Sequence, residues 1–486
     1  MKLPSTASSK TDCKNQPLFF QDLYSRKVAV DFSAGILSSD GGVLLLRPVD
    51  NAMGLTRRLA GCFHDHRNQR FVEHSLEELL SQRVYGLAAG SEDLNDHQQL
   101  RRDPLFATAC GKEDPLGEDR PVHPGAALAG AWTLNRLELS NNKNSRCHKI
   151  PHDPKKIEAL LVEMGARCVP KHAEEIIVDL DAMDHVLYGH QEGRHFHSYY
   201  DDFIYLPLYA FVGSIPVWAQ LRTSDVDPIE GVISALEAIV KALRKRSPRA
   251  RIIVRADCNF CREEVLEWCE RQKEVYYCIG FARNKALLER MGRTLADARA
   301  TRCLNGGATV RRFTEFEYQT KRSWSHPRRM VGKAQVSASD EDTRYVVTNL
   351  PVDGFRGEKD PERYGAQSIY EEIYCGRGEM ENMLKQQVLD LRADRMSTHH
   401  MESNQLRLWL ATFAHLLMER LRTTGLYGTE LAQATAGSVR LKLLKVAAQI
   451  RVSVRRVYVQ LSNAYPLQEL FRLCHSRLMK LPLWSD

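Results

Sequence analysis

The stretch EEIIVDLDAMDHVLYGHQEGRHFH, residues 174–197, places carboxylates inside and directly after an apolar run. An ionised Asp is costly to bury in a strand unless it has a partner, and a metal ion is one candidate partner. Side chains of a strand alternate between its two faces, so Asp179 and Asp181 share one face. Periodicity does not rank these two aspartates, and Asp184 lies beyond the predicted strand.

The segments that follow predict an α/β fold. FIYLPLYAFV, PVWAQLRT and RIIVRAD are predicted strands, and IEGVISALEAIVKALRK is a predicted amphipathic helix. A further helix, REEVLEWCERQ, and a strand, VYYCIGFAR, complete a strand-helix-strand unit. The carboxyl ends of neighbouring strands are where α/β proteins collect functional groups, and RIIVRAD ends in Asp257. The plainer interpretation is that Asp ends a strand and begins a turn.

A third carboxylate comes from the predicted helix IYEEIYCGRGEMENMLKQQVLDL. At about 100 degrees per residue, Arg377, Glu381 and Lys385 share one face with Tyr374. Glu381 lies beside the apolar stripe of this helix, whereas Glu379 lies away from it, so helical geometry favours Glu381. The plainer interpretation is an ordinary Glu381–Lys385 pair on a solvated helix.

Carboxylates from two strands and one helix suit two-metal phosphoryl transfer. Such a site holds two hard cations on oxygen ligands, about 3.5 to 4 Å apart. Arg377 and Lys385 would then contact phosphates or hold Glu381 in place, and the sequence leaves both roles open.

The motifs VDLDAMD, GHQEGRHFHSYYDDFIYLPLY, RIIVRADCNF and YCGRGEMENMLKQQ together resemble the DDE transposases of bacterial insertion sequences. The resemblance is to DDE domain group 1, whose last motif has a Tyr-x2-Arg-x3-Glu signature that Tyr374, Arg377 and Glu381 fit. It runs from about residue 18 to the end of the chain. It implies an RNase H-like core of the retroviral-integrase superfamily, interrupted by a β-rich insertion between the second Asp and the Glu.

The resemblance also implies the catalytic roles. Asp181 matches the first acidic position, Asp257 the second and Glu381 the third, so the resemblance selects Asp181 over Asp179. These three side chains would hold two Mg²⁺ ions, for which Mn²⁺ can substitute. Related enzymes hydrolyse a strand at the transposon end and direct the freed 3′-hydroxyl at another phosphodiester.

Two positions depart from the family pattern. Met183 stands where the family often has Thr, and Val388 stands where a Lys usually follows the Glu. Lys385 lies one turn from Glu381 on the same predicted face, so we expect it to take the place of the missing Lys.

Charge is unevenly placed along a chain of 486 residues with a formal net charge of +7. Residues 299–333 hold nine Lys or Arg against two Glu, and residues 437–480 hold nine against one. Local excesses of positive charge of this kind suit a polyanion such as DNA, although the plainer alternative is an ordinary solvent-exposed surface. Trp324 would stack on an unpaired or flipped base, with packing within a strand an equally favoured alternative. The candidate DNA contacts in KRSWSHPRR are Lys321, Arg322, Trp324, Arg328 and Arg329.

The composition predicts a cytoplasmic protein, associated with the nucleoid when bound to DNA. Hydrophobic residues make up 43% and charged residues 27%, which is ordinary for a globular chain, and no apolar segment predicts a membrane span. The lone CxxC of Cys258 and Cys261 lacks the second pair that a zinc site needs. The histidines around the first motif are therefore interpreted as polar or structural.

The predicted architecture has four parts. A polar stretch at residues 138–156 is the expected first boundary. The parts are a mainly helical N-terminal region expected to bind DNA ends (1–150), an RNase H-like core (170–284 and 366–425), a β-rich insertion (285–365) and a mixed basic C-terminal region (426–486).

The predicted function is a transposase that binds the terminal inverted repeats of an insertion sequence and pairs the two ends as a homodimer. One alternative is an RNase H-like DNA nuclease without joining activity. Another is a non-catalytic DNA-binding protein derived from a transposase, and the presence of all three acids argues against it.

Overall fold

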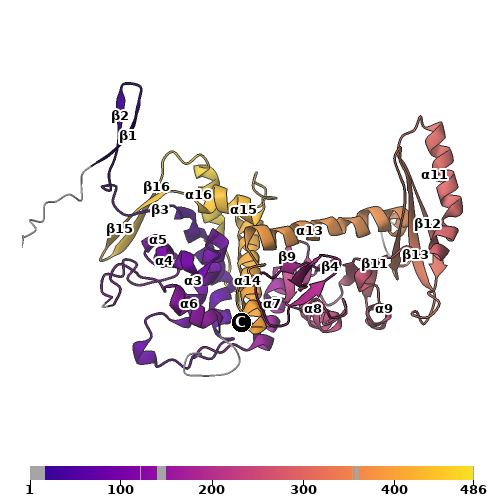
Figure 1. The fold of residues 1–486 in the computed structure, drawn as a ribbon, viewed down its shortest axis with the longest axis horizontal. Coiled ribbons are helices and arrows are strands. Elements are labelled where there is room, and N and C mark those ends of the chain that lie inside the picture. Colours follow the sequence, from indigo (N-terminus) through magenta and orange to yellow (C-terminus); the bar gives the residue numbers. More distant parts are fainter. Residues whose placement is uncertain (1–16, 121, 140–148, 353, 356–360, 485–486) are drawn as a thin grey trace, which may run out of the picture.

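The computed structural model describes residues 17–120, 122–139, 149–352, 354–355 and 361–484. Its centre is a mixed sheet of eight strands, and a largely helical body lies beside the sheet (Figure 1). The fold is therefore α/β, as the sequence predicts.

Five strands of this sheet come from the segments around the acidic motifs. The first three strands form an antiparallel meander, because β4 pairs antiparallel with β8 and β8 with β9. The last two strands run parallel to β4, in the order β4, β10, β11. Helix α8 (Val232–Arg246) links β9 to β10, and α9 (Glu263–Arg271) links β10 to β11. The strands are β4 (Glu175–Ala182), β8 (Leu208–Val212), β9 (Ile215–Gln220), β10 (Arg251–Ala256) and β11 (Val275–Phe281).

The two faces of β4 carry different side chains, as the period of two predicts. Ile176, Val178 and Leu180 are buried in one core cluster with the apolar stripe of α8. Ile177 points the other way and packs with the helical segment that contains the Tyr-x2-Arg-x3-Glu signature. Asp179 and Asp181 share this second face, so both carboxylates lie on the side that the signature helix covers.

The predicted β-rich segment continues the central sheet. It begins with two helices, after which three antiparallel strands extend the sheet through pairing of β14 with β11. In Figure 1 these strands and α11 project at one end of the molecule. The elements are α10 (Lys285–Arg290), α11 (Gly292–Leu304), β12 (Val310–Tyr318), β13 (Arg328–Val336) and β14 (Glu341–Thr348).

The N-terminal part is mainly helical but begins with a hairpin that the sequence did not predict. Helix α3 starts with a capping box, in which Ser75 N donates to Glu78 Oε2 at 2.7 Å and Glu78 N donates to Ser75 Oγ at 3.2 Å. The elements are β1 (Leu18–Leu23), β2 (Arg26–Val30), β3 (Leu37–Ser38), α1 (Leu46–Met53), α2 (Leu55–Ala60), α3 (Leu76–Ala89), α4 (His97–Leu100), α5 (Pro104–Ala109), α6 (Ala131–Glu138) and α7 (Pro154–Cys168). Of the predicted boundary stretch, residues 140–148 lie outside the described part of the chain.

The C-terminal part combines a buried helix with a basic hairpin. Helix α14 is buried along most of its length and packs against α3 and β9. The segment from residue 439 begins with a helical turn and continues into the antiparallel strands β15 and β16. The elements are α14 (Met401–Gly425), α15 (Ala436–Val439), β15 (Ala448–Ser453), β16 (Arg456–Leu461) and α16 (Gln468–Leu478), with short strands β5 (His185–Val186), β6 (His195–His197) and β7 (Asp202–Tyr205) elsewhere. Among the described residues, no helix is long and apolar enough to cross a bilayer.

The predicted helix IYEEIYCGRGEMENMLKQQVLDL lies almost entirely in a segment, residues 366–390, that is helical but not a regular α-helix. It contains α12 (Ala366–Ser368), a π-helical turn (Ile369–Tyr374), a tight turn (Cys375–Arg377), α13 (Gly378–Lys385) and a second π-helical turn (Gln386–Asp390). Glycines let it approach the sheet closely. A Cβ at Gly376 would lie 2.6 Å from Arg255 Nη1, and one at Gly280 would lie 2.5 Å from Tyr374 Oη.

This close approach predicts a specific cost for a methyl group at position 280. Gly280→Ala should lower the free energy of unfolding by about 1–3 kcal/mol, because the new Cβ overlaps the Tyr374 hydroxyl. Tyr374→Phe removes that oxygen, so the double variant should be more stable than the sum of the two single changes predicts. Urea denaturation of the four proteins measures this coupling. Gly292→Ala is the control, since no heavy atom lies within 4 Å of its added Cβ, and strict additivity would contradict the packing described.

Candidate catalytic site

Asp179 forms an ion pair with an arginine on the neighbouring strand. Arg255 lies opposite Asp179 in the β4–β10 register, and both side chains are buried. Its Nε donates to Asp179 Oδ1 at 2.5 Å and its Nη2 donates to Oδ2 at 2.7 Å. Burial raises the pKa of Asp179, and the hydrogen bonds from Arg255 oppose that shift. Both carboxylate oxygens of Asp179 are therefore already bonded.

Asp181, two residues further along the same face, has a different environment. Its Oδ1 accepts a hydrogen bond from Ala182 N at 2.9 Å, and its Oδ2 accepts one from Arg377 Nη1 at 2.8 Å. Burial raises the pKa of Asp181 to about 6, against the opposing effect of Arg377. The charges of Asp257 and Glu381 add to the rise. Asp257 and Glu381 thus both lie close enough to Asp181 for their charges to act on it.

Asp257 ends β10 and also starts the turn that follows. Its Oδ1 accepts a hydrogen bond from Asn259 N at 2.9 Å, and its Oδ2 accepts one from Asn259 Nδ2 at 3.1 Å. The plain interpretation of a turn-forming Asp is therefore correct for its local structure. Its charge nevertheless reaches Asp181, so the two interpretations are compatible.

Arg377 connects two of the three carboxylates. Besides its bond to Asp181, its Nη2 donates to Glu381 Oε1 at 3.3 Å. The Glu381 side chain is 53% exposed, whereas that of Arg377 is 18% exposed. Glu379 is exposed as well, and its charge raises the pKa of Asp179 without a hydrogen bond between the two. Glu381 is thus the glutamate linked to Asp181, as helical geometry favoured.

The other signature residues divide into packed and exposed groups. The ring of Tyr374 lies 5.7 Å from that of Tyr370, and burial raises the pKa of Tyr374 to about 12. Lys385 is exposed at the end of α13, and no hydrogen bond or ion pair joins it to another described residue. Lys385 is therefore placed to meet a ligand from solvent, while Tyr374 anchors the helix on the sheet.

The chemistry of the donor set fits a hard divalent cation. All three predicted ligands offer carboxylate oxygens, which Mg²⁺ prefers. Mutual repulsion also raises the pKa of Asp181, so added positive charge at this point would be stabilising. The described side chains do not form a closed set of three metal ligands, and the Arg377 guanidinium bridges Asp181 and Glu381.

The basic segment of the predicted insertion is only partly available to DNA. Trp324 is 5% exposed and packs edge-on against Phe281 and Tyr318, which is the strand-packing alternative. Arg328 is buried and bonded to two glutamates, and Arg329 is bonded to Glu315. Lys321 and Arg322 are exposed, so of the five candidates these two face solvent without a described partner.

The histidines and cysteines do not assemble a zinc site within the described residues. His185 is fully buried beside Tyr209, and burial lowers its pKa to about 3. His195 lies 3.3 Å from Asp225. Structural and polar roles account for both residues.

Two residues near the site were not singled out from the sequence. Arg255 occupies the same face of RIIVRAD as Asp257, and that alternation was the available signal. Tyr200, within HSYYDDF, is close enough for Asp184, Asp181 and Asp257 to add to the rise of its pKa that burial causes. Its neighbour Tyr199 is 82% exposed, so two tyrosines border the carboxylates.

The environment of Asp181 predicts a pH-dependent stability. Its pKa is about 6 in the folded chain and 3.8 ordinarily, so the folded state retains a proton that the unfolded state releases. The contribution of Asp181 to stability should therefore fall as pH rises from about 4 to about 6. The variant Asp181→Asn lacks this titration, so its free energy of unfolding relative to wild type should rise by about 3 kcal/mol over that interval.

Urea denaturation in EDTA at several pH values measures this difference. Asp31→Asn is the control, because hydrogen bonds from Ser33 lower the pKa of Asp31 and its difference from wild type should therefore change little between pH 4 and 6. A difference between Asp181→Asn and wild type that stays constant from pH 4 to 6 would contradict the electrostatic environment described.

Comparison with known proteins identifies the family. No curated protein matches the chain significantly. The cryo-EM structure of a piggyBac transposase synaptic complex with hairpin DNA is similar over 84% of this chain and 80% of that chain, at 11% sequence identity and a TM-score of 0.39. So low a score carries no argument about fold. The family model described as transposase DDE domain group 1 matches residues 20–483, nearly the whole chain, which therefore belongs to this transposase family.

Proposed function

We propose that the protein binds the terminal inverted repeats of an insertion sequence and catalyses metal-dependent cleavage and strand transfer of DNA there. The observation that carries this proposal is that Arg377 bonds to both Asp181 and Glu381, while Asp257 follows β10, the strand that pairs in parallel with β4. These acids, from two strands and one helix, are the proposed catalytic set.

The strand arrangement supports an RNase H-like catalytic core. An antiparallel meander, β4–β8–β9, is followed by two strands parallel to β4, in the sheet order β9-β8-β4-β10-β11. In this arrangement β4 is central and the ends of β4 and β10 carry Asp181 and Asp257. The helix with Glu381 then crosses the same face.

Asp181, Asp257 and Glu381 would hold Mg²⁺, or Mn²⁺ in its place. When bound, the metal supplies Lewis-acid activation of the attacking oxygen and stabilisation of the leaving oxygen. Arg377 donates hydrogen bonds to Asp181 and Glu381, and its planar guanidinium also suits a phosphate. Lys385 would meet the DNA backbone from the exposed end of α13.

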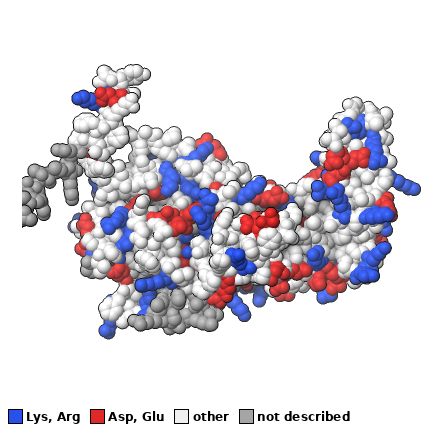
Figure 2. Space-filling model, viewed as in Figure 1, with Lys and Arg blue, Asp and Glu red and all other residues white. Residues whose placement is uncertain are grey.

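DNA contact is proposed at several surfaces, with a homodimer holding the paired ends. Figure 2 shows lysines and arginines over both halves of the molecule, interspersed with acids. The proposed contacts are the N-terminal helices, the exposed basic residues between β12 and β13, and the C-terminal hairpin β15–β16. Interspersed charge favours separate local contacts over one continuous basic track.

Substitution of each acid tests the catalytic assignment. Asp181→Asn, Asp257→Asn and Glu381→Gln should each reduce Mg²⁺-dependent cleavage of end-containing DNA by more than the roughly 10- to 100-fold cost of losing an outer-shell partner. DNA binding should persist, because the change removes a metal ligand and not a phosphate contact. Asp184→Asn is the matched control. Retained cleavage in all three acid variants would show that the site assignment is wrong.

Substitutions of the basic residues around the β12–β13 turn should have two separable effects, one on DNA binding and one on the stability of the fold. Lys321→Ala and Arg322→Ala should leave stability within about 0.5 kcal/mol of wild type. Each should reduce the slope of log binding constant against log salt by about 0.9 for duplex DNA. Arg328→Ala should instead destabilise the fold by about 3–5 kcal/mol, because it leaves Glu263 and Glu270 without their buried partner.

Fluorescence anisotropy at several salt concentrations, together with urea denaturation, separates these effects. An unchanged salt slope for Lys321→Ala and Arg322→Ala would place the DNA elsewhere.

A further inference from the structure

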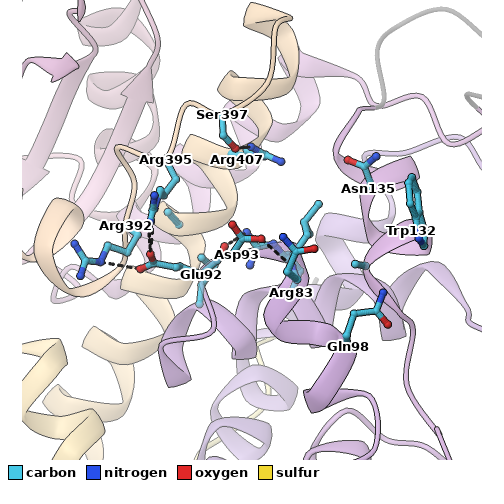
Figure 3. A pocket seen from close by; sticks show the side chains of 15 residues that line it. Arg83, Glu92, Asp93, Gln98, Trp132, Asn135, Arg392, Arg395, Ser397 and Arg407 are labelled. Atoms are coloured by element: carbon cyan, nitrogen blue, oxygen red, sulfur yellow. Dashed lines mark hydrogen bonds and ion pairs between the residues drawn. The ribbon is translucent and has the colours of Figure 1, made fainter. Parts of the chain in front are cut away.

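A polar pocket of about 380 Å³ lies between the N-terminal helices and α14, apart from the three carboxylates. It is lined by α3, the turn after α3, α6, the segment at residues 392–397 and α14. Figure 3 shows Trp132 and Asn135 on one side of the pocket and Arg392 and Arg395 on the opposite side, with Arg83 between. The catalytic site described above does not use these residues.

Two arginines of the pocket share one buried glutamate. Arg83 and Arg407 both bond to Glu138, with Arg407 Nε donating to Glu138 Oε2 at 2.6 Å. Glu138 is fully buried, and although burial opposes the effect, the two arginines lower its pKa. Glu138 is therefore an anion, and one positive charge of this trio is uncompensated.

A second pair of arginines repeats this arrangement on the opposite wall. Arg392 Nε donates to Glu92 Oε2 at 2.7 Å, and Arg395 Nε donates to Glu92 Oε1 at 3.0 Å. Asp93 lines the same pocket, and Asp394 lies near both arginines, so four acids balance the four arginines of these two groups.

A third basic group adjoins the pocket at the loop before α6. Burial lowers the pKa of Arg101, and the charges of Arg120 and Arg102 lower it further, with Glu73 opposing. The Nε of Arg101 is buried without a hydrogen-bond partner among the described residues. Arg101 Nη1 lies 2.7 Å from the place of a Cβ at Gly130, two residues before Trp132. Positive charge therefore gathers beside the pocket and favours an anionic ligand.

Trp132 gives this basic surface a flat apolar platform. Its side chain is 77% exposed at the start of α6. Asn135 follows one turn later, and Asn95 from the turn after α3 and Gln98 from α4 also line the pocket. Carboxamides both donate and accept hydrogen bonds, as the edge of a nucleobase does, and exposed aromatic rings stack on bases.

We propose that this pocket binds an unpaired nucleotide of DNA, with the base stacked on Trp132 and the phosphate against Arg101 and the basic side chains beside it. An unpaired nucleotide fits because stacking requires a free base face, which a duplex does not offer at its grooves. The inference rests on the proposed function only in that DNA is the polymer bound.

Binding of single-stranded DNA without divalent metal tests this site. The probe is a fluorescein-labelled 15-residue oligothymidine in EDTA, compared with a 15-base-pair duplex by fluorescence anisotropy. Trp132→Ala should weaken oligothymidine binding by about 5- to 100-fold and duplex binding much less, because only the stacked base is lost. Trp132→Phe should retain most of the affinity. Tyr427→Ala, which truncates another aromatic residue that is 74% exposed, should have no effect.

Three outcomes would overturn the proposal. The first is absence of oligothymidine binding by the wild-type protein, and the second is equal affinity of Trp132→Ala and wild type. The third is that dTMP displaces the oligonucleotide completely and binds as tightly as the oligonucleotide does, which would assign the pocket to a free nucleotide.

A photo-crosslink from 5-iododeoxyuridine to Trp132 would support the site independently of the variants. Failure of end cleavage with intact Trp132-dependent binding would contradict the proposed function and leave this proposal standing.

Discussion

The guanidinium of Arg255 joins two strands and a helix at the centre of the sheet. Two of its nitrogens bond to both oxygens of Asp179 on β4, and its Nη1 bonds to the carbonyl of Ile373 at 2.5 Å. All three partners are buried, so loss of the arginine would leave an uncompensated carboxylate in the core, a change that costs about 3–5 kcal/mol in comparable cases. This single side chain therefore ties β4 to β10 and holds the signature helix against both strands.

That position determines what Arg377 and Glu381 can reach. Arg377 follows Ile373 by about one turn, and it bonds to Asp181 and Glu381 together. Gly376 and Gly280 permit the helix to lie this close, because a Cβ at either position would overlap Arg255 or Tyr374. The carboxylates that the helix brings together repel one another, and this repulsion contributes to the raised pKa of Asp181. This repulsion destabilises the folded chain, and a cation bound at the site would reduce it.

Local patterns predicted the elements well, but not which partners they would find. The period of two placed Asp179 and Asp181 on one face, yet their ranking depended on which strand lies beside β4 and where its arginine falls. Helical periodicity favoured Glu381 correctly, although two π-helical turns interrupt the regular helix that the calculation assumed. Trp324 was undecided because its burial depends on Phe281 and Tyr318, which lie 43 and 6 positions away in the sequence. The β1–β2 hairpin has no strong turn signal and was missed.

Strand transfer is the activity that separates a transposase from a nuclease, and it tests the role of the carboxylates most directly. The measurement uses a pre-cut end with a free 3′-hydroxyl, a supercoiled target plasmid and Mg²⁺. Wild-type protein should give covalently joined end and target, and Asp181→Asn should bind the end and give none. Cleavage of ends without any joined product, or joining that persists in Asp181→Asn, would contradict the account.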